Sequence, residues 1–203
     1  MPSDPTCSHA VNTERVSTYT MTKTVQTGLP GQPLAVHYLG EVYVPENVAR
    51  IQTEGPTAYM TEEFATFYTV SLTNGSLTAR PSGACDPAHA CAQGYADPPI
   101  FATATGSHAM GVFSKRHPEG QYVLFNFALG NDANNTTKWT LPFVDTNVAA
   151  GTTLKYEVFI CVGPLASVVK CMLQLAGSTA AEYANPPNVK VPIPMSVSSL
   201  DRV

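Results

Sequence analysis

The fold is indicated most directly by one stretch of the sequence, Tyr68-Thr-Val-Ser-Leu-Thr-Asn-Gly-Ser-Leu-Thr-Ala-Arg80. Apolar and polar residues alternate on both sides of Asn74-Gly75. Asn-Gly is the pair that best tolerates the positive φ angles of a two-residue hairpin turn. The stretch therefore predicts two antiparallel strands joined by a tight turn at Asn74-Gly75.

Strand-like segments continue on both sides of this hairpin. Alternating segments lie at 16–25, 34–44, 122–129, 138–143 and 154–162, and shorter apolar segments lie at 100–105 and 108–113. In 138–143 the alternation places Trp139, Leu141 and Phe143 on one face of a single strand. About eight short strands separated by turn residues are typical of a two-sheet sandwich or a jelly roll.

The segment 163–177 has helical spacing instead. Pro164 stands near its start and Gly177 near its end, where these residues favour helix boundaries. Its apolar residues recur every three or four positions: Leu165, Val168, Val169, Met172 and Leu173. We therefore predict one helix here.

The tail beyond Tyr183 contains four prolines and cannot form a central strand. Its apolar residues alternate with polar residues or prolines, so an extended arm could lay one apolar face on a neighbour: Val189, Val191, Ile193 and Met195. The sequence thus predicts an all-β fold, an antiparallel β-sandwich or jelly roll with one short C-terminal helix and an extended proline-containing tail. We expect an N-terminal arm at 1–15, a single β-sandwich domain at 16–177 and the tail at 178–203.

The composition argues against two classes of partner. Charged residues make up 13% of the 203 residues, about half the roughly 25% usual in globular proteins, and the net charge is −4. Lysine and arginine do not cluster beyond Lys115-Arg116, so the basic surface of a nucleic-acid-binding protein is not expected. No apolar run approaches the ~20 residues that span a membrane. The start at Met1 lacks the features of a signal peptide, and we interpret the chain as a mature fragment given a start methionine.

The cysteines suggest an oxidising compartment. The chain contains five: Cys7, Cys85, Cys91, Cys161 and Cys171. Cys85 and Cys91 bracket a short loop that a disulfide can close, and the single His89 between them is too little for a metal site. Cys161 and Cys171 either form a second disulfide or remain two buried thiols. Cys7 is then left over, as a thiol or bonded to another chain.

Three glycosylation sequons favour the same compartment. They begin at Asn74, Asn134 and Asn135, all in predicted turns where a glycan would not disturb a core. Chance triplets in a threonine-rich chain are the alternative. The low charge and the cysteines also suggest an extracellular or cell-surface protein.

Residues that could bind a ligand are few. His108 precedes an apolar segment and Arg116 follows it, and such side chains hydrogen-bond hydroxyl and acid groups. Exposed Tyr95 and Trp139 would supply rings on which sugars stack, although core burial explains Trp139 equally well. We expect these four residues, with the loop 81–99, to frame a site. No catalytic, metal or cofactor motif is found, and whether the protein is an enzyme is left open.

Two functions remain as hypotheses. The first is an extracellular β-sandwich module that binds carbohydrate, as part of a larger carbohydrate-active protein. The second is a structural subunit of a surface assembly, such as a filament, sheath or capsid, whose copies are joined through the C-terminal arm by strand addition. The expected partners are therefore carbohydrate or neighbouring copies of the same chain.

Overall fold

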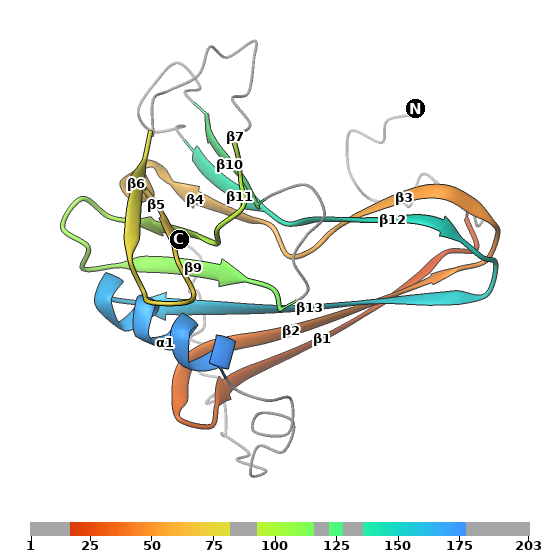
Figure 1. Cartoon of the computed structure of the whole chain (residues 1–203), viewed down its shortest axis with the longest axis horizontal. Coiled ribbons are helices and arrows are strands. Elements are labelled where there is room, and N and C mark those ends of the chain that lie inside the picture. Colours follow the sequence, from red (N-terminus) through yellow and green to blue (C-terminus); the bar gives the residue numbers. More distant parts are fainter. Residues whose placement is uncertain (1–16, 82–92, 116–121, 128–135, 178–203) are drawn as a thin grey trace, which may run out of the picture.

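The computed structural model describes residues 17–81, 93–115, 122–127 and 136–177. Within them the chain is almost entirely antiparallel β-structure with one α-helix near the end (Figure 1), so the predicted fold class is confirmed. The strands are β1 (Thr20–Leu29), β2 (Gln32–Val44), β3 (Val48–Glu54), β4 (Ala58–Thr61), β5 (Thr66–Val70), β6 (Leu77–Arg80), β7 (Gln93–Tyr95), β8 (Pro99–Ala102), β9 (Ala109–Phe113), β10 (Tyr122–Phe127), β11 (Thr136–Thr140), β12 (Pro142–Val148) and β13 (Thr152–Gly163). A single 3-10 turn, η1 (Glu62–Phe64), precedes β5, and the helix is α1 (Leu165–Gly177).

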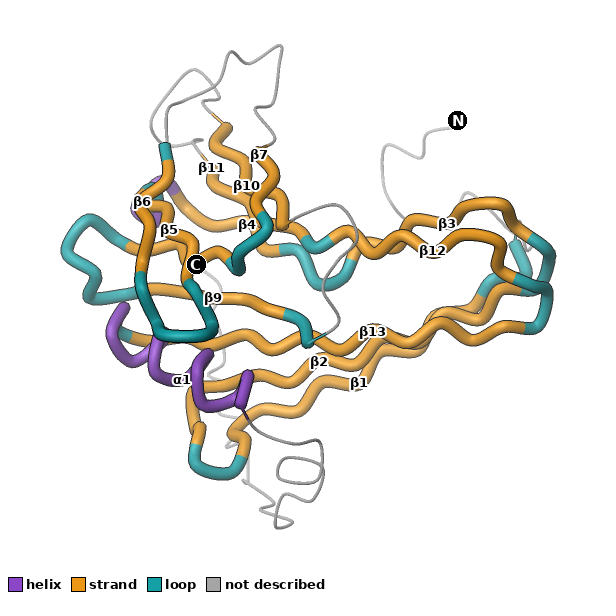
Figure 2. The backbone as a smooth tube through the Cα atoms, in the orientation of Figure 1, coloured by secondary structure: helices purple, strands orange, loops and turns teal. Residues whose placement is uncertain are grey.

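Three layers make up the described fold. A seven-stranded sheet, in the order β1-β2-β13-β9-β8-β5-β6, forms the middle layer. A four-stranded sheet (β4-β11-β10-β7) and the ribbon of β3 with β12 lie on one face, and α1 lies on the other (Figures 1 and 2). Because the middle sheet is covered on both faces around β13, the near-continuous apolar run in that strand is expected there.

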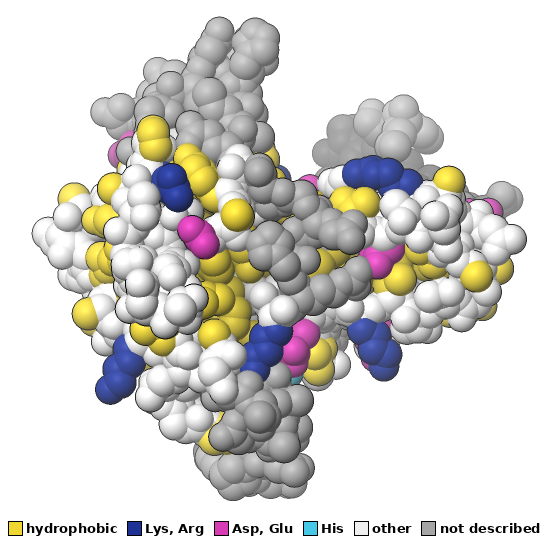
Figure 3. All heavy atoms as spheres, in the orientation of Figure 1, with side chains coloured by type: hydrophobic (Ala, Val, Ile, Leu, Met, Phe, Trp, Pro, Cys, Tyr) yellow, Lys and Arg dark blue, Asp and Glu magenta, His cyan; other side chains and the backbone are white. Residues whose placement is uncertain are grey.

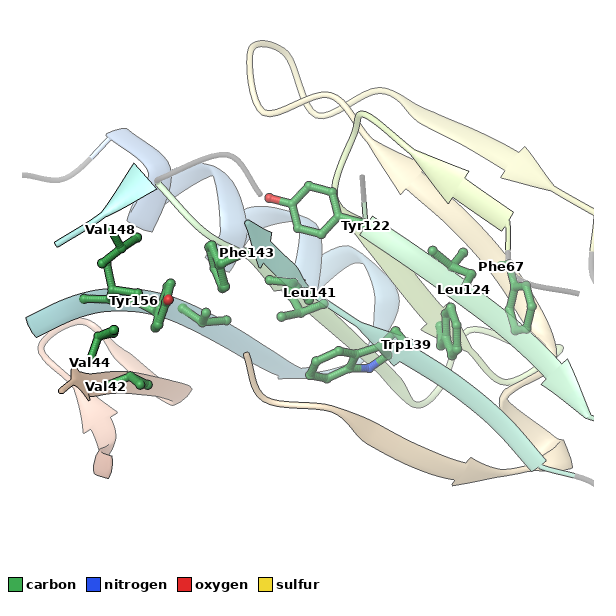
Figure 4. Close-up of a cluster of buried hydrophobic side chains, with 14 residues drawn as sticks. Val42, Val44, Phe67, Tyr122, Leu124, Trp139, Leu141, Phe143, Val148 and Tyr156 are labelled. Atoms are coloured by element: carbon green, nitrogen blue, oxygen red, sulfur yellow. The ribbon is translucent and has the colours of Figure 1, made fainter. Parts of the chain in front are cut away.

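The main core lies between the middle sheet and the smaller sheets (Figure 4). Its largest side chains include Trp139 from β11, Phe143 from β12 and Tyr156 from β13, each at most 2% exposed. The Phe143 and Tyr156 rings are 4.7 Å apart, and the Tyr156 hydroxyl lies 3.1 Å from Thr53 Oγ1 in β3. These contacts attach the β3–β12 ribbon to the long strands of the middle sheet.

The second layer contains a bend that the sequence pattern does not show. The predicted single strand 138–143 is wrong, because the chain leaves β11 at Thr140 and starts β12 at Pro142, in another sheet. The Leu141 carbonyl accepts a hydrogen bond from the Gly55 N–H at 2.8 Å. A Cβ at Gly55 would lie 3.0 Å from the Phe143 ring, so a glycine allows the two turning segments to approach closely.

The helix α1 packs on β9 and β13, and a disulfide joins Cys171 of the helix to Cys161 of β13. Of the two alternatives that the sequence left open for these cysteines, the structure therefore shows the disulfide. Gly111 in β9 allows the close approach, because a Cβ there would lie 2.8 Å from Val168 Cγ1. Cys7, Cys85 and Cys91 lie outside the described residues, as do the arm 1–15 and the tail 178–203.

The hairpin that suggested the fold is present, but its turn differs from the prediction. The last paired residues are Val70 and Leu77, so the loop has six residues rather than two. Gly75 has a positive φ of 77° and Asn74 does not, because the Asn74 carboxamide accepts the Ser76 N–H at 3.0 Å and the Gly75 N–H bonds back to the Ser71 carbonyl. Asn74 is exposed in this loop, whereas Asn134 and Asn135 lie outside the described residues; glycosylation stays a prediction.

Candidate functional site

Of the residues predicted to bind a ligand, the three that the structure describes, Tyr95, His108 and Trp139, do not share one set of contacts. Trp139 is 1% exposed between the two sheets, so the prediction of an exposed stacking ring is wrong for it, and its alternation with Leu141 reflects burial. Arg116 lies outside the described residues. Of the two rings predicted to stack on sugars, only Tyr95 is therefore left.

His108 lies in a turn of the seven-stranded sheet, and Tyr95 lies in a strand of the four-stranded sheet. His108 is exposed in the β8–β9 turn, where its backbone carbonyl accepts the Thr103 N–H at 2.9 Å and its Nδ1 lies 3.0 Å from Ser107 Oγ. Tyr95 belongs to β7, and the Arg80 guanidinium lies over its ring at 4.5 Å from the ring centre. Each residue is thus held by its own local contacts, and the two do not form one binding surface.

A pocket of about 700 Å³ opens elsewhere, at the C-terminal end of α1. Its walls come from the loop after β5, from residues 96–98 before β8, from the end of β9 and from the start of β10. Hydrophobic side chains gather in this part of the face shown in Figure 3. The lining of the pocket includes the apolar residues Leu72, Phe113 and Leu173. A volume of this size is typical of small-molecule sites.

The rim of the pocket is polar. Asp97 and Lys115 are exposed at its edge, and Ser71 and Thr73 add hydroxyl groups. A carboxylate accepts hydrogen bonds, an ammonium donates them and hydroxyls do both, so this rim matches a neutral ligand that carries several hydroxyls. Residues 96–98 belong to the loop 81–99 that the sequence pointed to, and Lys115 precedes Arg116.

Tyr122 forms the back of the pocket and is 1% exposed. Its hydroxyl accepts the Ser114 N–H at 3.2 Å, while Ser114 Oγ donates to the Glu157 carbonyl at 2.7 Å. Burial raises the pKa of Tyr122 to about 12, the negative charge of Asp97 adds to the rise, and the Ser114 hydrogen bond opposes it. Tyr122 is therefore a neutral phenol at physiological pH and not a base.

A histidine and a carboxylate meet beside the pocket. His37 Nε2 in β2 lies 2.8 Å from Glu157 Oε1 in β13, and its ring stacks on Phe159 at 4.7 Å. Such a pair can serve general-base catalysis, but His37 is only 6% exposed and lies flat against its neighbour. We interpret the pair as a contact that holds β2 to β13.

Two other kinds of site are not seen in the part of the chain that the structure describes. No group of three or more potential metal-binding side chains occurs there. Within the same ranges, no helix is both long and apolar enough to cross a membrane.

The second candidate site is the outer edge of β1. This ten-residue strand ends the seven-stranded sheet, and among the described residues no strand pairs with its outer side. Unpaired N–H and C=O groups along such an edge are a template for another strand. Monomeric proteins usually protect long edges with charges or prolines, and β1 carries only Lys23.

Exposed apolar side chains gather on the same two strands. Seven large hydrophobic residues of the described part are markedly exposed, and five of them belong to β1 or β2: Met21, Val25, Leu34, Leu39 and Tyr43. Met21 and Val25 are 48% and 57% exposed, and their register opposite Val42 and Tyr38 places both on the face that packs against the smaller sheets. The smaller sheets leave this strip of β1 uncovered.

The sequence signals for both sites are weak. Alternation in 16–25 predicts a strand, but an edge strand and a central strand can alternate in the same way, so only the pairing identifies the edge. Asp97 and Tyr122 lie 25 residues apart, and nothing in their local sequence links them. The two prolines after Asp97 indicate a turn and no more.

Comparison with models of known protein families and with curated proteins gives no match.

Proposed function

We propose that this protein is a structural subunit that assembles with copies of itself outside the cell or at the cell surface. The observation that carries the proposal is the ten-residue β1 edge, which is unpaired within the described residues and bordered by exposed Met21 and Val25. An exposed long edge with few charges favours pairing between chains. The Cys161–Cys171 disulfide supports an oxidising compartment.

The proposal is tested by the mass of the full chain in solution. Light scattering over a range of concentrations should give a multiple of the chain mass for the wild type. Val25→Lys places a second charge on β1 and should shift the protein to the monomer. Because Val25 is already 57% exposed, the variant should change the free energy of unfolding by only about 0.5 kcal/mol or less.

Leu77→Lys is the matched control for this variant. Leu77 is 37% exposed on β6, the edge strand at the opposite side of the same sheet. It should leave the assembly intact. A wild type that stays monomeric at every concentration, or two variants with the same effect, would contradict the proposal.

Carbohydrate binding is the second candidate, and the pocket at the end of α1 is the observation that favours it. We propose this pocket as the sugar site in place of the dispersed His108, Tyr95 and Trp139. Its apolar floor and its hydroxyl, carboxylate and ammonium rim suit a monosaccharide unit.

Calorimetric titration with a panel of mono- and oligosaccharides tests this second candidate. Asp97→Asn and Lys115→Met should each weaken binding by about tenfold, because each removes a charged hydrogen-bonding group. His108→Ala lies outside the pocket and should leave the affinity unchanged. If no sugar of the panel binds, or if the pocket variants bind as the wild type does, carbohydrate binding at this pocket is rejected.

A further inference from the structure

We infer that segment 188–196 of a neighbouring copy fills the β1 edge, as one added antiparallel strand that cannot itself accept a further strand. The inference rests on the proposed function, because it names the contact through which the copies assemble. It is carried by the match between the pattern of prolines in the tail and the geometry of the edge.

The prolines of the segment all lie on one side of an extended chain. In a strand, the backbone N–H and C=O of one residue point to one neighbouring strand and those of the next residue point to the other. Pro192 and Pro194 have the same parity, so both missing N–H groups would face away from β1. The residues 189, 191, 193 and 195 keep their N–H groups and would present them to β1.

The outward side of the added strand is therefore poor in donors. Proline within sheets is found at edges, where its missing N–H faces solvent. A strand with prolines at 192 and 194 can complete the β1 edge, but it offers no regular ladder to a second added strand. The proline positions therefore predict that each β1 edge binds one tail and that no further strand adds to that tail.

The side chains of the segment alternate between the two faces of the strand in the same way. Val189, Val191, Ile193 and Met195 would share one face of the strand, with Lys190 and the prolines on the other. On β1, Met21 and Val25 are exposed on one face on either side of Lys23, while Thr22 and Thr24 are exposed on the other. Docking with the apolar faces together removes apolar surface from water on both strands.

The length and the starting point of the tail also fit. The segment has nine residues and β1 has ten. The described chain ends at Gly177, close to the β1–β2 turn, because Gln32 at the start of β2 donates a hydrogen bond to Gln174 of α1. The ten residues 178–187 span at most ~35 Å, which is about the length of β1 itself, and Pro186-Pro187 favour an extended chain. The segment can therefore leave its own subunit and lie on the edge of a copy beside it.

Two proline variants of the full chain test the inference. Val191→Pro removes an N–H on the side that faces β1 and should raise the dissociation constant of the assembly by about tenfold or more. Lys190→Pro adds a proline at the neighbouring position but on the outward side, and should change the dissociation constant by less than about twofold. Light scattering across a concentration series measures both, and Val191→Ala shows how much of the effect comes from the side chain alone.

Cross-linking identifies the copy that supplies the strand. In a Cys7→Ser background, Val25→Cys protein is mixed with Ile193→Cys protein and oxidised; a disulfide between two chains supports exchange between copies. A chain that carries both cysteines and forms only the internal link would show that the tail covers its own edge, and would overturn the inference.

The failures of the two proposals are distinguishable. If the wild type assembles and both proline variants assemble equally well, the tail contact is wrong and the proposed function stands. If the wild type is monomeric at every concentration, the proposed function itself fails, together with the inference that rests on it.

Discussion

Tyr122 links the pocket to the core at the level of a single residue. Its ring is buried, and its hydroxyl accepts a hydrogen bond from the backbone N–H of Ser114. The Ser114 hydroxyl in turn donates to the carbonyl of Glu157. The phenol thus links β10 to Ser114, the residue after β9, and the Ser114 hydroxyl continues the link to β13. Because burial disfavours the phenolate, the pKa of Tyr122 is raised from the ordinary 10.0 to about 12.

This pKa predicts a loss of stability in alkaline solution. Between pH 10 and 12 the unfolded chain releases the Tyr122 proton while the folded protein keeps it, so the contribution is fully present below pH 10 and is lost as the pH rises through 12. The free energy of unfolding should fall by about 2–3 kcal/mol over this range. Urea denaturation at several pH values measures it, and Tyr122→Phe should remove this part of the slope.

Tyr59→Phe is the control for this measurement. Tyr59 is 66% exposed, so Tyr59→Phe removes a phenol outside the core and shows whether a change in slope is specific to Tyr122. An equal slope in wild type and Tyr122→Phe would contradict the account of Tyr122.

At the scale of the elements, features that depend on local sequence could be predicted, whereas features that depend on contacts between distant residues could not. The helix predicted at 163–177 is found as Leu165–Gly177, because its apolar spacing and its terminal Pro and Gly act within the segment. The division of 138–143 between β11 and β12 could not be predicted, because it depends on a hydrogen bond from Gly55, far away in the sequence. The open edge of β1 and the pocket around Tyr122 likewise depend on which strands become neighbours.

The disulfide between β13 and α1 gives the prediction at this scale. The disulfide joins residues ten positions apart and so restricts the unfolded chain. Replacing both cysteines, Cys161→Ala with Cys171→Ala, should therefore lower the free energy of unfolding by about 2–4 kcal/mol. Urea denaturation with and without a reductant measures the change. The wild type should fall to nearly the stability of the double variant when it is reduced. A double variant as stable as the oxidised wild type would show that the bond contributes nothing to the attachment of α1.

In the described part of the chain, the other layers cover one part of the middle sheet and leave another part exposed. The middle sheet is packed on both faces around β13 and β9, whereas β1 and β2 carry most of the exposed large hydrophobic side chains and end in an unpaired edge among the described residues. Neither feature is required by the core. The unpaired edge and the exposure of Met21 and Val25 are accounted for if the edge receives the tail of another copy, which is the central claim about this protein.

Amide hydrogen exchange along β1 of the full chain, measured at low and high protein concentration, tests that claim most directly. Outward-facing amides of β1 should exchange quickly in dilute protein and become protected as the concentration rises, while amides of the central strand β13 stay protected throughout. Fast exchange in β1 at every concentration would show that no strand is added. Complete protection at a concentration where light scattering gives the mass of one chain would show that the edge is closed within one chain, and either result would contradict assembly through β1.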